Sequence, residues 1–337
     1  MALLAGDATY KPSTLRTRRV DLISFAKKAV RLGLPISDLS SLVRLLDPDL
    51  VEQIIDDQWK RDGEEPKVYT IDLAKKLLSV ARLHKCLDAT GLSRLDDMRA
   101  NLEQYRRGGL TPKNLALIRQ ALNDDVWQRV VNCPGSLMRQ ARSIKDQAPV
   151  KAAITAQIAV AIAILTVAPI RASNLAAICL AENLIKPGGP QTPYWLVFPH
   201  YDVKNRVDLN FPLDESLTAL IDEYVHEFRP LLLRGTNGTW LFPGETGGSK
   251  DAHGFGIQIT ERIKKATGLR ITIHQFRHAA AAIYLKHRPG EYETVRRLLG
   301  HRSIQTTIKF YCGLETIQAT RDFGEIVRQH LVLNTDI

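Results

Sequence analysis

One stretch in the last quarter of the chain gathers side chains that suit chemistry on a phosphodiester. His274, Arg277 and His278 follow the i, i+3, i+4 spacing, so on a helix they share one face. His301 and Tyr311 follow on the elements expected next. Arginine binds phosphate oxygens through a planar fork of donors. Histidine moves protons near neutral pH, and an activated tyrosine can be a covalent nucleophile. Together these residue types favour nucleophilic attack on phosphorus.

Three short linked helices are expected to position these side chains. Pro289 stops the first helix, and Gly300 ends the second directly before His301. Ser303 is a predicted N-cap for the third helix. The first two predicted helices span residues 274–287 and 292–299, and the third begins after Ser303 and has Tyr311 near its end, just before Gly313.

The order of these residues resembles the C-terminal signature of tyrosine recombinases, the phage integrase family. The shared motifs are His274-x-x-Arg277-His278, Leu298-Leu299-Gly300-His301, Thr306-Thr307 and Tyr311. Family members often place the tyrosine nine residues after the last histidine of the motif. Here Phe310 stands at that position and Tyr311 follows it, which indicates a one-residue length variant. Cys312 is a less suitable nucleophile, because the family uses tyrosine.

The resemblance extends upstream to two further cations. Arg171 matches the first arginine of the family, after an apolar helix predicted over 149–169. Asn174 stands where the family often has an acid. Lys204 lies at the turn between two predicted strands, where recombinases carry a lysine. Arg206 on the same turn is the alternative to Lys204.

The resemblance also implies a role for each residue. Arg171 and Arg277 would hold one phosphate, and Tyr311 would attack it to form a 3′-phosphotyrosyl link. Since free tyrosine has a pKa of about 10, its proton needs an acceptor, and His274 is the expected base. Lys204 would protonate the leaving 5′ oxygen.

Two more histidines complete the implied site. His301 would bond the phosphate, and His278 would brace the helix or the site. No cofactor and no metal is expected, because the covalent link conserves the energy of the phosphodiester bond.

Charge and cysteine content agree with a nucleic-acid partner. The net charge is +10 and the pI about 9.5, and both halves of the chain are basic, so a polyanion is a plausible partner. None of the cysteines forms a C-x-x-C pair, so neither a zinc site nor a disulfide framework is indicated. The N-terminus has no signal-peptide pattern, and the longest apolar run, 158–165, is too short to span a bilayer.

The predicted fold is mainly α with a small antiparallel β-sheet in the C-terminal half, a two-domain clamp like that of tyrosine recombinases. The first half has helix signals throughout, with starts predicted at Ser13, Thr70, Ser93 and Thr111. Strands are predicted at 194–198 and 207–211, where β-branched and aromatic residues gather. The predicted domains are a flexible N-terminus over 1–12, a helical core-binding-like domain over 13–145, and a catalytic domain over 146–337 with a tail helix at 315–333.

The resemblance implies a site-specific DNA recombinase or integrase that acts in the cytoplasm on the bacterial nucleoid. Its expected partners are double-stranded DNA at specific sites, three further copies in a tetramer on paired sites, and accessory DNA-bending or directionality proteins, with no membrane. Tails of this kind dock on a neighbouring subunit in the family, and packing within the same chain is the alternative. Two other functions fit the sequence: DNA relaxation like that of type IB topoisomerases, and DNA binding without cleavage.

Overall fold

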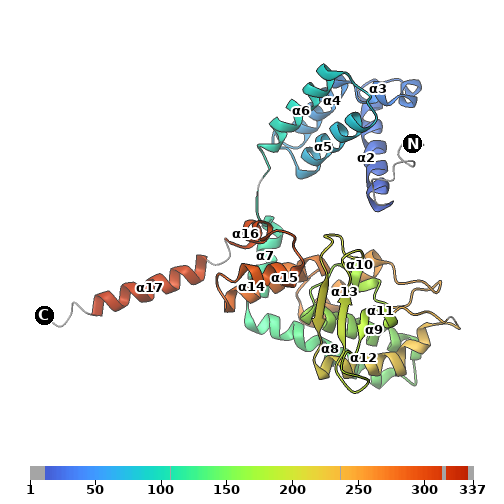
Figure 1. Ribbon diagram of the computed structural model, residues 1–337, viewed down its shortest axis with the longest axis vertical. Coiled ribbons are helices and arrows are strands. Elements are labelled where there is room, and N and C mark those ends of the chain that lie inside the picture. Colours follow the sequence, from blue (N-terminus) through green and yellow to red (C-terminus); the bar gives the residue numbers. More distant parts are fainter. Residues whose placement is uncertain (1–11, 107, 236, 313–315, 333–337) are drawn as a thin grey trace. The chain divides into compact units, whose positions relative to one another are not determined.

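The chain divides into two compact units, with the boundary between residues 107 and 108 (Figure 1). The computed structural model describes residues 12–106, 108–235, 237–312 and 316–332. The sequence had suggested a boundary at 145/146, but the helices over 112–144 belong to the second unit. Most of the expected flexible N-terminus, residues 1–11, lies outside the described residues. The clamp arrangement of the two units stays a prediction.

The first unit is a small helical bundle with its own apolar core. Its elements are α2 (Pro12–Arg31), η1 (Ile36–Ser40), α3 (Leu42–Leu45), α4 (Pro48–Arg61), α5 (Val68–Leu83) and α6 (Ala89–Glu103). Two of the predicted helix starts were wrong. Helix α5 begins before Thr70, and Asp88 caps α6 through the backbone N–H of Gly91, well before Ser93. Phe25 and Leu46 are fully buried in the core of this unit.

The second unit is built around one apolar helix, α9. Its helices before the sheet are α7 (Pro112–Ala121), α8 (Asp124–Ile144), α9 (Pro149–Val167), α10 (Ala172–Ala176) and α11 (Leu180–Asn183). Helix α9 is long and apolar enough to cross a membrane, yet most of it is buried inside the protein. Helices α8, α12 (Glu215–Glu223) and α13 (Ala252–Thr267) pack against it, so it serves as the core of this unit. Thr111 caps α7 as predicted.

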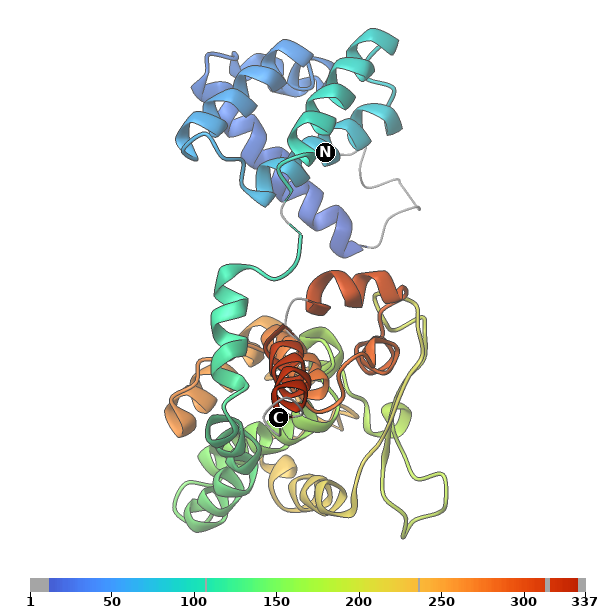
Figure 2. The ribbon, with the colours of Figure 1, turned by 90° about the vertical axis from the view of Figure 1, so that its left-hand side faces the viewer.

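A three-stranded antiparallel sheet follows, in the order β1 (Leu184–Ile185), β2 (Trp195–Phe198) and β3 (Leu209–Pro212). Strands β2 and β3 confirm the two predictions and pair with Phe198 opposite Leu209. The two-residue strand β1 was not predicted, because so short a strand leaves no alternation in the sequence. Figure 2 shows the sheet, in yellow-green, along one side of the second unit.

The remaining helices carry the C-terminal motif. They are α12 (Glu215–Glu223), the π-helical turn η2 (Tyr224–Phe228), η3 (Arg229–Leu232), α13 (Ala252–Thr267), α14 (Ile273–His287), α15 (Tyr292–Leu299), α16 (Ile304–Tyr311) and α17 (Thr316–Val332). Ser303 caps α16, and Gly300 ends α15 in the left-handed region with φ +58°, both as predicted. Helix α17 confirms the predicted tail helix within the described residues. The apolar side chains of Phe323 and Leu331 on it are 66% and 62% exposed.

Candidate active site

Arg277 joins three separate parts of the second unit. It lies in the first turns of α14, which begins at a capping box between Thr272 and Gln275. Arg277 is only 4% exposed. Its two terminal nitrogens donate to the backbone carbonyls of Pro169 and Leu299. The side chain thereby fixes the segment after α9 and the end of α15 on either side of itself.

Arg171 supplies a second guanidinium close to the first. It occupies the N-cap position of α10, two residues after the carbonyl that Arg277 binds. Its Nη1 atom is buried and has no hydrogen-bond partner among the described residues. Burial lowers the pKa of Arg171. Burial and the charge of Arg171 together lower the pKa of Arg277 to about 10. A buried and a half-buried cation that lie close together, with a free donor on one of them, are suited to an anion that bridges them.

Tyr311 is buried at the end of α16, with 1% of its surface exposed. Its ring packs into a small apolar cluster on α14 and α15, formed with Ala281, Leu285, Val295 and Leu299. The hydroxyl oxygen lies 2.8 Å from Nδ1 of His278. Burial raises the pKa of the Tyr311 hydroxyl well above its usual range. The phenol is therefore protonated in the free protein.

The three histidines are neutral bases at pH 7. Burial, followed by neighbouring positive charges, lowers the pKa of His278 to about 4 and that of His301 to about 4. Partial burial and nearby cations also lower the pKa of His274. The rings of His274 and His278 meet edge to face, 4.8 Å between centroids. Both imidazoles are thus available to accept a proton.

His301 is held at the corner between α15 and α16. Its Nδ1 lies 2.9 Å from the hydroxyl oxygen of Thr307, a side chain with no exposed surface. Its carbonyl accepts from Nη1 of Arg296, and its backbone N–H donates back to the Arg296 carbonyl. With Nδ1 bonded within the protein, Nε2 is the nitrogen left to meet a ligand.

Lys204 lies on the turn that joins β2 to β3. Its side chain is exposed, and its charge contributes to the lowered pKa of His274, which puts it within electrostatic reach of the other residues. Arg206, the alternative, takes a left-handed backbone conformation with φ +52° further along the same turn. The structure gives no contact between Arg206 and the histidines or arginines of the site.

Asn174 occupies α10, one turn after Arg171. Its side chain is only 6% exposed and lines a separate pocket of about 310 Å³ with Glu182 and Asp202. The position where the family often has a carboxylate is therefore neutral here, and two carboxylates lie on the same pocket.

A cavity of about 280 Å³ opens beside Tyr311, the three histidines and Arg277. Arg171 and Lys204 are not among the residues that line it. The residues that line it are Gly109, Leu110, Thr111, Asn114, His274, Arg277, His278, His301, Phe310 and Tyr311. The segment from Gly109 to Asn114 was not predicted as part of the site. It reaches the site because α7 packs on α14, where Gln275 Nε2 donates to the Asn114 side chain at 3.1 Å. Nothing in the local sequence of this segment could have indicated that contact.

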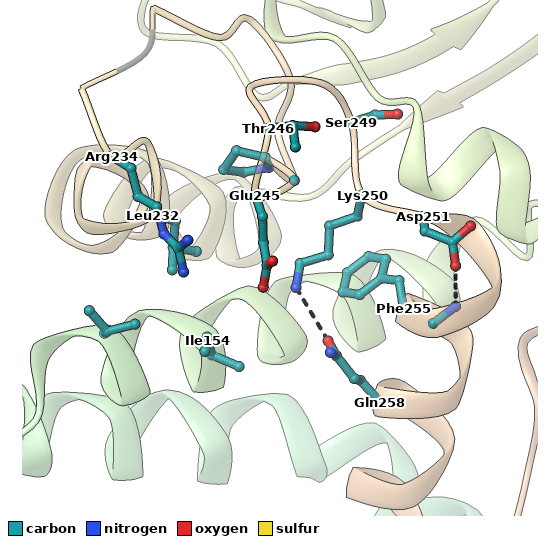
Figure 3. Close-up of a pocket in the computed structure, with 14 residues that line it drawn as sticks. Ile154, Leu232, Arg234, Glu245, Thr246, Ser249, Lys250, Asp251, Phe255 and Gln258 are labelled. Carbon is teal, nitrogen blue, oxygen red and sulfur yellow. Dashed lines mark hydrogen bonds between the residues drawn. The ribbon is translucent and has the colours of Figure 1, made fainter.

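A larger pocket of about 400 Å³ lies elsewhere in the second unit and contains none of the predicted site residues. Figure 3 shows Lys250 directed into it, with Nζ 3.3 Å from the side-chain oxygen of Gln258. Burial lowers the pKa of Lys250. Its lining includes two carboxylates, Glu245 and Asp251, but no histidine or tyrosine, so this pocket lacks a tyrosine nucleophile.

The family model described as the phage integrase family matches residues 139–316, more than half of the chain. The chain belongs to the phage integrase family. The match covers every residue of the site except the Gly109–Asn114 segment. A search of curated protein sequences found no match.

Solved structures of similar fold come from the same family. A lambda integrase dimer bound to a core site is 16% identical, with 91% of this chain and 90% of that chain covered and a TM-score of 0.50. XerH recombinase bound to a palindromic difH substrate is 14% identical, with 83% and 85% covered and a TM-score of 0.48. The Tn1549 transposon integrase with transposon right-end DNA is 16% identical, with 92% of each chain covered and a TM-score of 0.46. At these identities the lambda integrase match supports the two-domain fold of tyrosine recombinases.

Proposed function

We propose that this chain is a site-specific DNA recombinase that cleaves and rejoins DNA through a 3′-phosphotyrosyl intermediate. The observation that carries the proposal is the meeting of Tyr311, three histidines and Arg277 around one cavity, with the charge of Arg171 close enough to lower the pKa of Arg277. Nη1 of Arg171 is buried and has no partner among the described residues, and the Tyr311 phenol on the cavity is protonated. A phosphodiester satisfies both, as anion for the arginines and as electrophile for the tyrosine.

Arg171 and Arg277 bind the non-bridging oxygens and offset the charge that grows in the pentacovalent transition state. The hydrogen bond between the Tyr311 hydroxyl and His278 breaks first. Tyr311 then attacks phosphorus, and a bond forms between Oη and phosphorus. His274 takes the phenolic proton. His278 contacts the hydroxyl in the free protein, yet its pKa of about 4 makes it a weak base. A base is most effective when its pKa is close to the working pH.

Lys204 donates its proton to the 5′ oxygen as the phosphorus–oxygen bond breaks, and His301 bonds the phosphate. Attack by a 5′-hydroxyl from a second DNA strand reverses each step and transfers the 3′ end to that strand. The phosphotyrosyl bond keeps the energy of the original phosphodiester, so this cycle requires no nucleotide and no metal.

The proposed assembly is a tetramer of this chain on two paired double-stranded DNA sites in the bacterial cytoplasm, at the nucleoid. A lambda integrase tetramer on a Holliday junction is among the solved structures, at 16% identity. The exposed apolar side chains on α17 support a docking role for the tail. Accessory DNA-bending or directionality proteins belong to the same proposal.

The test is to capture the covalent adduct on genomic DNA in the presence of EDTA and to map its sites. A recombinase cleaves at a few defined sequences and exchanges strands between two copies of them. Scattered cleavage with relaxation of supercoils and no exchange would indicate a topoisomerase. Specific binding with no adduct, or cleavage that chelation stops and magnesium restores, would contradict the proposed mechanism.

A further inference from the structure

The turn that carries Lys204 is fastened to the corner that carries His301. The side-chain amide of Asn205 donates to the backbone carbonyl of Gly300 at 2.8 Å. Asn205 follows Lys204 directly, and Gly300 precedes His301 directly. One hydrogen bond therefore links the neighbours of two site residues that lie far apart in the sequence.

A second contact joins the same two segments. A Cβ added to Gly300 would lie 2.7 Å from Cδ2 of Leu209, the first residue of β3. Gly300 also has φ +58°. A side chain at this position would be strained in its backbone and would push the hairpin away. The absence of a side chain allows β3 to approach the corner closely enough for Asn205 to reach the carbonyl.

The same corner is held from its other side by Arg277, which donates to the carbonyl of Leu299. Successive backbone carbonyls at Leu299 and Gly300 thus receive one donor from the phosphate-binding arginine and one from the Lys204 turn. The position of the turn relative to Arg277 and His301 is set by these bonds. Val203, the residue before Lys204, has no exposed surface, and its apolar packing anchors the turn on that side.

We infer that Asn205 is a positioning residue for Lys204, holding its ammonium group within reach of the leaving 5′ oxygen. The inference rests on the proposed function, in which Lys204 donates the proton to that oxygen. The Lys204 side chain is long, flexible and exposed, so without a fixed turn its ammonium would sample many positions away from the scissile bond. Asn205 fixes the backbone from which it extends.

The test compares two DNA substrates that differ in one atom. In the first the leaving atom is the natural 5′ oxygen, which needs a proton. In the second it is a bridging sulfur, which leaves as a thiolate without one. Single-turnover cleavage is measured for the full-length wild type and for Lys204→Ala, Asn205→Ala and Asn210→Ala. Asn210 is exposed on β3 of the same hairpin, so its variant is the matched control.

Asn205→Ala is expected to slow cleavage of the oxygen substrate about 10-fold, and the sulfur substrate should restore it to within a fewfold of wild type. Lys204→Ala should lose roughly 10²–10⁴-fold on oxygen and recover with sulfur in the same way. If Lys204→Ala recovers while Asn205→Ala stays slow on sulfur, or if Asn205→Ala is as fast as wild type on oxygen, the inference is overturned. Failure of Lys204→Ala to recover overturns the proposed role of Lys204, and with it the inference.

A second measurement follows the turn itself without DNA. Limited trypsin digestion cuts after Lys204 and Arg206 if the turn opens. Asn205→Ala should be cut there several-fold faster than wild type, while Asn210→Ala should match wild type. Equal digestion of all three proteins would contradict a fastening role for Asn205.

Discussion

Nδ1 of His278 lies 2.8 Å from the hydroxyl oxygen of Tyr311, and both side chains are buried. Because the pKa of His278 is lowered to about 4, its ring is neutral at pH 7 and can accept the phenolic hydrogen. Burial at the same time raises the pKa of Tyr311. The free protein thus keeps the proposed nucleophile protonated and shielded from water, and in the proposed mechanism DNA binding has to draw the hydroxyl towards phosphorus.

Replacing each of the paired histidines distinguishes the base from the residue that holds the tyrosine. His274→Ala should slow single-turnover cleavage roughly 10²–10⁴-fold, the range expected for loss of a general base. His278→Ala should cost less, because it removes only a hydrogen bond to the resting nucleophile. The rates are measured on a suicide substrate at saturating protein. A larger loss in His278→Ala would assign the base to His278.

Folding stability should fall as the solution is acidified below about pH 6.5. His278 and His301 have pKa values of about 4 in the folded protein, against 6.5 for a free histidine. Above pH 6.5 both histidines are neutral in the folded and the unfolded chain, so they do not lower the free energy of unfolding. Between pH 6.5 and 4 only the unfolded chain takes up protons on them, so the free energy of unfolding falls as the pH falls. With a discount for the partial exposure of both rings to solvent, the loss should reach roughly 2–4 kcal/mol between pH 7 and 4.

Urea unfolding at pH 7.5, 6 and 5 measures this effect. The double variant His278→Gln with His301→Gln should show a flatter dependence of the unfolding free energy on pH than wild type. His253→Gln, an exposed histidine on α13, is the matched control and should keep the wild-type slope. Equal slopes for the double variant and wild type would contradict the lowered pKa values.

The first unit should contact the DNA backbone through the basic face of α2. Arg16, Arg19 and Lys27 are exposed on this helix. Each phosphate contact adds roughly −0.9 to the slope of log K against log salt. The triple Gln variant of the full chain should therefore show a slope shallower by one to three units in a binding titration.

The control for the salt experiment is Arg94→Gln, since Arg94 already pairs with Asp49 and Glu52. It should keep the wild-type slope. A triple variant whose slope equals that of wild type would mean that α2 does not contact the phosphates.

The tail helix α17 should act in assembly. The double variant Phe323→Asp with Leu331→Asp places charges on its exposed apolar side chains, so docking on a neighbouring subunit should be lost. Binding to a single site should stay within about twofold of wild type, while synapsis and strand exchange fall. Arg328→Gln on the same helix is the control. Unchanged exchange would reject docking between subunits, and a variant monomer that unfolds would show packing within one chain.

The sequence predicted the local parts of the site and missed their long-range connections. The helix ends at Gly300 and Ser303 could be predicted, because caps and left-handed glycines depend on a few adjacent residues. The bonds from Arg277 to two distant carbonyls could not, because they depend on how α9, α14 and α15 pack. The place of Asn114 on the cavity could not be predicted either, because it depends on how α7 packs on α14. The domain boundary was placed too late because α7 and α8 are helices like those before them, and only packing assigns them to the second unit.

The central claim is that Tyr311 is the nucleophile, although it stands one position later than is common in the family. The most direct measurement isolates the covalent adduct on a suicide substrate, digests it, and locates the DNA-bearing residue by mass spectrometry. Wild type and Phe310→Leu should carry the nucleotide on Tyr311, while Tyr311→Phe should bind the same DNA and form no adduct. An adduct on any other residue, such as the exposed Cys312, or an adduct in Tyr311→Phe, would contradict the claim.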